Sequence, residues 1–86
     1  MSGSIDNLVR MANQIGDFFG TMKDRRQSLE EIAAHLRRFW EPRMRTALLA
    51  HLDHQAGAGL SDIVLDSLRT HRERIVQATR LVRRDW

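Results

Sequence analysis

The chain of 86 residues contains no cysteine. Disulfide bonds and thiolate metal sites are therefore excluded, and nothing in the composition indicates an oxidising compartment. No apolar run approaches the ~20 residues that a membrane-spanning helix needs, and the start at Met1-Ser2-Gly3-Ser4 does not resemble a signal peptide. We therefore expect a cytoplasmic protein without a membrane partner, folded as a single helical domain over residues 1–86.

Lysine is nearly absent as well, since Lys23 is the only one among 14 basic residues. The formal net charge is +3, and residues 63–86 carry six basic and three acidic residues, so the whole excess lies near the C-terminus. A patch of this size is modest beside the basic surfaces of nucleic-acid-binding proteins. No specific nucleic-acid partner is predicted.

Only one proline occurs, and it lies within the most distinctive stretch of the chain, residues 35–45. Proline disfavours helical geometry in the residue before it but can begin a helix at its first position. The stretch therefore predicts a helix-turn-helix corner at Trp40-Glu41-Pro42. Aromatic rings and arginines gathered at one corner are typical of protein interfaces. The candidate partner-binding residues here are Arg37, Arg38, Trp40, Arg43 and Arg45.

Capping residues and hydrophobic periodicity predict an all-α fold, a small bundle of about four helices. No segment alternates as a strand does. Helix starts are indicated by Ser4, by Asp24 or Ser28, by Pro42 and by Ser61. The expected helices cover approximately residues 5–22, 25–40, 42–54 and 62–82, and residues 83–86 are expected to form a mobile tail.

The apolar side chains of the first helix spread over about 180° of its circumference, wider than one core contact requires. The excess edge consists of Met11, Phe18 and Met22. These three residues are further candidates for partner binding, because flexible methionine beside phenylalanine is common at adaptable contact surfaces. The alternative interpretation is that this helix is central in the bundle and all its apolar side chains belong to the core.

The second and fourth helices carry two further expectations. A core stripe on the second helix is expected to contain Leu29, Ile32, Ala33, Leu36, Phe39 and Trp40. Most of Phe39 and Trp40 is expected in the core, and Trp40, at the last turn, is the better placed of the two to reach an interface. On the fourth helix Arg72 shares a face with apolar residues. Either Arg72 pairs with a carboxylate at the edge of the core, or the helix leaves the bundle and lies on another surface.

Patterns for catalysis or metal binding are weak. His51 and His54 lie one turn apart, but only His35 is available as a third ligand, so no metal site is predicted. The segment 57–61 resembles a phosphate-binding turn, but no strand precedes it, so we interpret it as a helix stop followed by a cap. No Ser or Thr forms a hydrolase pattern with a histidine and an acid. We predict neither an active site nor a bound cofactor in this chain.

Two kinds of binding remain. A basic helical module would use its arginines to bind nucleic acid or another acidic partner, but no recognition helix with interleaved aromatic residues is evident. A protein-interaction module would use the same arginines together with the wide apolar face of the first helix. The domain is also so small that a partner, or a second copy of the isolated chain, can complete its core. The protein-interaction interpretation explains more of the sequence.

Three blocks of the chain, residues 8–19, 32–45 together with 48–52, and 57–61, carry a resemblance to a known family. The central block is the most specific, because it combines rare residues at fixed spacing: His35-Leu36-Arg37-Arg38-Phe39-Trp40, then Pro42-Arg43-Met44. From about residue 7 to residue 68, the chain resembles the delta subunit of bacterial NAD-dependent, molybdenum-containing formate dehydrogenase.

The resemblance implies an accessory subunit of an oxidoreductase complex, with no cofactor of its own and no enzyme activity by itself. In the complex that it implies, the larger subunits carry a molybdenum pterin cofactor, iron–sulfur clusters, FMN and the NAD site. The implied partner is the catalytic alpha subunit. The implied role is support of assembly, cofactor insertion or stability.

Overall fold

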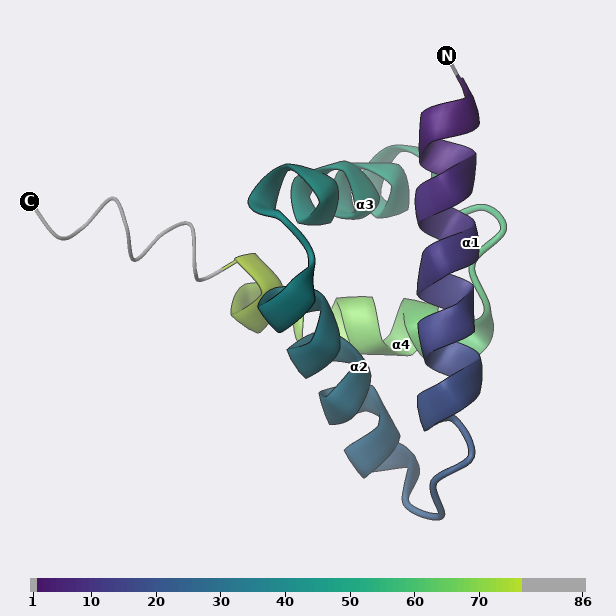
Figure 1. Ribbon diagram of the computed structural model, residues 1–86, viewed down its shortest axis with the longest axis vertical. Helices are drawn as coiled ribbons and strands as arrows, with labels where there is room; N and C mark the ends of the chain where they lie inside the picture. The colour runs from purple at the N-terminus through teal and green to yellow at the C-terminus, as the bar shows by residue number, and fades with distance from the viewer. Residues whose placement is uncertain (1, 77–86) are drawn as a thin grey trace, which may run out of the picture.

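A computed structural model describes residues 2–76 of the chain (Figure 1). It contains the helices α1 (Ser2–Phe19), α2 (Arg25–Phe39), α3 (Pro42–Gln55) and α4 (Asp62–Thr70). Residues 72–76 are helical again after a turn at His71, and no strand occurs within the described range. The predicted all-α fold is therefore confirmed.

The first helix differs from the prediction at both ends. It begins at Ser2 rather than after a cap at Ser4, and it ends at Phe19 rather than at residue 22. Gly20 follows directly, and glycine has a low propensity to continue a helix. Met22, which was expected on the helix, lies in the connection to α2, where its backbone N–H donates to the carbonyl of Phe19 at 3.2 Å.

The fourth helix is shorter than predicted. It ends at Thr70, and the turn at His71 separates it from the helical residues 72–76. The predicted helix end at residue 82 and the predicted mobile tail at 83–86 lie outside the described residues.

The corner between α2 and α3 has the geometry that proline dictates. Trp40 and Glu41 are both extended, with φ/ψ of −89°/140° and −67°/151°, and Pro42 occupies the first turn of α3. An extended Glu41 avoids the clash between the proline ring and the preceding residue. The predicted corner is confirmed.

The helices surround one core. Figure 1 shows α1 and α2 converging at the loop that joins them and diverging at their other ends, with α3 beyond the wide end of this V and α4 crossing behind both helices. All four helices contribute to the core, and α2 packs against each of the other three. The buried apolar residues are Ala12, Ile32, Ala33, Leu36, Trp40, Leu48, Leu49, Leu52, Leu60, Val64, Leu68 and Ile75.

One part of the predicted core stripe is wrong. Phe39 is 65% exposed, whereas Trp40, which was expected to reach an interface, is only 6% exposed. Phe39 is still helical and lies at the edge of the stripe, on the side toward His35, so its ring remains outside. Trp40 follows the last helical residue and is extended, and its ring is buried as the stripe predicted.

Candidate interaction surface

Four rings from α1 and α2 form a continuous row. Phe18 and Phe19 meet edge to face with ring centroids 5.0 Å apart, and Phe19 lies 6.0 Å from the ring of His35. The ring of His35 lies in turn 4.7 Å from that of Phe39. The two outer members of the row, Phe18 and Phe39, are 71% and 65% exposed. Aromatic pairs at these distances are mutually stabilising, so the row holds its outer rings in defined positions at the surface.

An apolar groove of about 460 Å³ runs beside this row. Its walls come from α1 and α2, and Trp40 contributes the buried side. The residues that line it are Met11, Gln14, Ile15, Phe18, Phe19, His35 and Trp40. A concave, mostly apolar surface with a few polar groups is the usual form of a binding site. We name this site the α1/α2 groove.

The large apolar side chains that remain exposed in residues 5–76 gather at this groove. They are Met11, Phe18 and Phe39, and the first two line the groove directly. Met11 and Phe18 belong to the excess apolar edge that periodicity indicated on the first helix. Met22, the third member of that edge, is half-buried in the loop after α1 and does not line the groove.

The arginines of the predicted corner divide into two groups. Arg37, Arg38 and Arg43 are exposed, and the guanidinium carbon of Arg38 lies 5.6 Å from the centroid of the Phe39 ring, a cation–π distance. Arg45 was predicted to bind a partner, but it is only 5% exposed, and its Nη1 donates to the carbonyl of Arg37 at 3.1 Å. Arg45 therefore holds the corner together from inside and is not available at the surface.

A second, basic pocket lies on the other flank of the α2 C-terminal turn. It has a volume of about 300 Å³ and is lined by Ala34, Arg37, Arg38 and Arg74. Arg74 comes from the helical residues after His71 and was not among the predicted site residues. Only the tertiary fold brings Arg74 next to α2, so no pattern in the sequence indicated that it lines this pocket.

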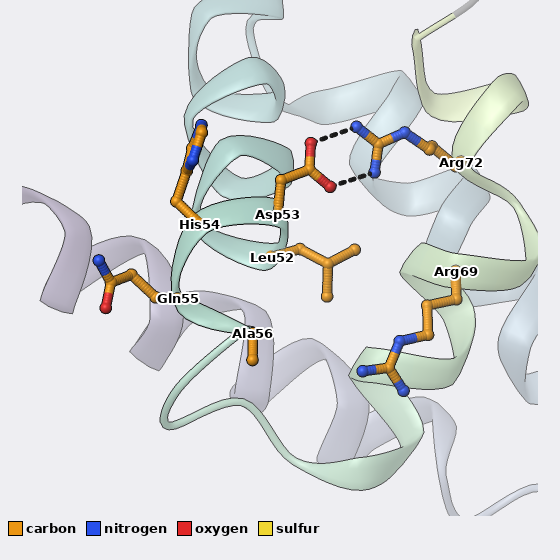
Figure 2. Close-up of a pocket in the computed structure, with 7 residues that line it drawn as sticks. All are labelled: Leu52, Asp53, His54, Gln55, Ala56, Arg69 and Arg72. Carbon is orange, nitrogen blue, oxygen red and sulfur yellow. Dashed lines mark hydrogen bonds and ion pairs between the residues drawn. The ribbon is translucent and has the colours of Figure 1, made fainter.

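A third, polar hollow lies between the end of α3 and α4 (Figure 2). Arg72 reaches across it to Asp53, with nitrogen–oxygen distances of 3.0 and 2.6 Å. This two-point hydrogen bond lowers the pKa of the Asp53 carboxyl below its ordinary value of 3.8. The carboxylate is thus held ionised and paired, which makes it a poor general base. The sequence left open whether Arg72 pairs with a carboxylate or lies on a helix that leaves the bundle. The structure shows the pair with a carboxylate.

The histidines considered as metal ligands lie in unlike surroundings. The Nε2 of His51 lies 2.8 Å from the carbonyl oxygen of Ala58, where it closes the loop after α3. His35 is part of the ring row, and His54 lines the polar hollow. Within the described range, no three histidine or carboxylate side chains are grouped so that they could hold a metal ion. No helix in that range is both long and apolar enough to cross a membrane.

The fold and these surfaces define a class of protein: a small all-α bundle that presents an apolar groove beside a basic corner. Comparison with protein families then identifies the particular family. Residues 7–68 match the family of the NADH-dependent formate dehydrogenase delta subunit FdsD, and the chain belongs to this family. The resemblance predicted from the sequence is confirmed. Neither the curated proteins nor the solved structures contain a significant match to the chain.

Proposed function

We propose that this chain is a non-catalytic accessory subunit of a cytoplasmic formate dehydrogenase complex and that it binds the catalytic alpha subunit through the α1/α2 groove. Family membership supports the complex. In this proposal the molybdenum pterin cofactor, the iron–sulfur clusters, FMN and NAD belong to the larger subunits. The delta subunit supports the assembly, cofactor loading or stability of the alpha subunit.

One observation carries the choice of surface. Met11 and Phe18 are exposed in one groove and Phe39 is exposed beside it, although the remaining large apolar residues of the described helices are at least half-buried. An exposed apolar cluster of this kind does not stabilise the isolated domain. A partner that covers it stabilises the complex by the transfer free energy of three large side chains. Full burial of a phenylalanine contributes about 1.5–3 kcal/mol. Covering Phe18 or Phe39, each already about one-third buried, therefore corresponds to roughly a tenfold change in dissociation constant.

The test uses single substitutions at the exposed rings. Phe18→Ser and Phe39→Ser should each weaken binding of the co-expressed alpha subunit by about tenfold. Because both side chains are mostly exposed, the melting temperature of the isolated chain should change by only a few degrees. Gln55→Ser is the matched control, since Gln55 is exposed on α3 and lines the polar hollow instead of the groove. Wild-type affinity in both phenylalanine variants would refute this surface.

A second measurement separates the accessory roles. Complexes purified from cells with and without the delta subunit are compared for molybdenum content and for the melting temperature of the alpha subunit. Loss of molybdenum with an unchanged melting temperature indicates cofactor insertion, and the reverse indicates stabilisation. Equal values for both quantities, together with equal formate-dependent NAD reduction, would contradict an accessory role.

A further inference from the structure

We infer that the basic pocket lined by Ala34, Arg37, Arg38 and Arg74 binds carboxylate side chains of the partner segment whose apolar residues occupy the α1/α2 groove. The inference rests on the proposed function and deepens it, because it states the chemistry of the contacting segment. That segment is acidic as well as apolar.

The pocket is strongly basic in composition. Three of its four lining residues are arginines, and none is an acid. An arginine offers five N–H donors in a planar fork that matches the two oxygens of a carboxylate. Three such groups around about 300 Å³ repel one another in the isolated chain. An anionic side chain placed between them removes this repulsion and accepts several charge-assisted hydrogen bonds.

Other arginines of the chain are already paired with carboxylates. Arg25 pairs with Asp66 at 2.5 Å, and Arg72 pairs with Asp53. In the part of the chain that the structure describes, the guanidinium groups of Arg37 and Arg74 have no such carboxylate partner. They are exposed and face one pocket from two different elements.

A purely structural explanation covers only part of this arrangement. Arg37 and Arg38 belong to the last turn of α2, where positive charge interacts favourably with the helix dipole. However, the buried Arg45 already donates to the carbonyl of Arg37, so a cation is fixed at this helix end from inside. The dipole of α2 also gives no reason for Arg74, which comes from a segment far along the chain, to lie at the same pocket.

The basic pocket is continuous with the α1/α2 groove. Arg38 lines the basic pocket and also lies over Phe39, and the Phe39 ring contacts His35, which lines the groove. One short stretch of α2 therefore separates the two sites. A segment that seats an apolar side chain against Phe18 can continue over Phe39 and place a carboxylate among the arginines. Such complementary charge fixes the orientation of a partner and accelerates its association.

The test compares two charge reversals in the full chain. Arg74→Glu and Arg69→Glu both change the net charge by two units, and both residues are exposed, but Arg69 lines the polar hollow. Affinity for the purified alpha subunit is measured by biolayer interferometry at two salt concentrations. Arg74→Glu should weaken binding about tenfold and reduce its salt dependence. Arg69→Glu should remain within about twofold, because a remote charge acts only through the screened field. Arg74→Lys should recover part of the loss.

The outcomes distinguish this inference from the proposed function. If Phe18→Ser weakens binding and Arg74→Glu does not, the groove is retained and the carboxylate pocket is refuted. Equal losses for Arg74→Glu and Arg69→Glu would also refute it, since net charge alone would then explain the effect. If the wild-type chain does not bind the alpha subunit, both proposals fall. If Arg74→Glu lowers only the affinity for mixed-sequence duplex DNA, the pocket binds phosphates and the inference is overturned.

Discussion

Alanine in place of Gly16 has two opposing effects on stability, because Gly16 lies where α1 approaches α4 closely. Gly16 is buried in α1, and an added Cβ would lie 2.6 Å from Cγ2 of Val64 and 3.2 Å from Cγ2 of Ile63. Alanine in place of glycine favours the helix by about 1 kcal/mol. The contact with Val64 is about 1 Å too short for two carbon atoms. Overpacking of this kind costs roughly 1–3 kcal/mol.

The steric clash with Val64 should outweigh the gain in helix propensity. Val64 is fully buried and β-branched, so its methyl group has little freedom to move away. We therefore take the upper half of the overpacking range and expect Gly16→Ala to lower the free energy of unfolding by about 1–2 kcal/mol. For a domain of this size, the melting temperature should fall by roughly 5–10 °C. Urea denaturation followed by circular dichroism measures the free energy of unfolding, and a thermal scan with the same signal measures the melting temperature.

A double-mutant cycle identifies the cause. Val64→Ala alone leaves a cavity and should cost about 2 kcal/mol. In that background the methyl group of Gly16→Ala enters the vacated space, so the same substitution should become stabilising by up to about 1 kcal/mol. An equal loss of stability in both backgrounds, or a stabilising effect in the wild type, would refute the argument from close packing.

The other substitutions concern the corner and the polar hollow. Trp40→Ala should cost about 3–5 kcal/mol and leave little folded protein, so its effect on partner binding is interpretable only beside its melting curve. Arg45→Ala should lower the free energy of unfolding by about 2 kcal/mol. Arg45→Met keeps the apolar stem and removes a buried charge that has no carboxylate partner within residues 5–76. This variant should therefore recover most of the lost stability in urea denaturation. Asp53→Asn should lower the melting temperature at neutral pH. Because the pKa of Asp53 is lower in the folded state, the ionised carboxylate adds its full contribution to folding stability above pH 3.8. This contribution is lost as the pH falls through the lowered pKa of the folded state. The wild-type and variant melting temperatures should therefore converge in acid. A constant difference at all pH values would contradict the pairing with Arg72.

Local rules were sufficient for much of the fold. Pro42 and the extended Glu41 are set by the chemistry of proline, and the buried Ile32 and Leu36 follow from helical periodicity. The periodicity also indicated that Met11 and Phe18 form an excess apolar edge, and both residues line the groove. These features depend on spacing within one element, which a sequence displays directly.

The errors occur where one element ends or two elements meet. Phe39, the last residue of α2, lies at the edge of the apolar stripe, and helical spacing alone does not show where the buried face ends. Arg45 was assigned to the surface because charge usually lies there, but α2 offers it a carbonyl inside the corner. Arg74 reaches the basic pocket because the chain turns at His71, and no capping residue or proline in the sequence predicts this turn.

The two sides of α1 connect packing to partner binding. Ala12 and Gly16 are buried, and Gly16 sets the close approach to α4, while Met11 and Phe18 form part of the groove. These residues belong to one rigid helix, so any shift of α1 away from α4 also moves one wall of the groove relative to α2. Gly16→Ala should therefore weaken binding of the alpha subunit even though Gly16 is not among the residues that line the groove. Restoration of binding by Val64→Ala in the same chain would show that the effect passes through the position of α1. Loss of binding that persists in the double variant would contradict this coupling.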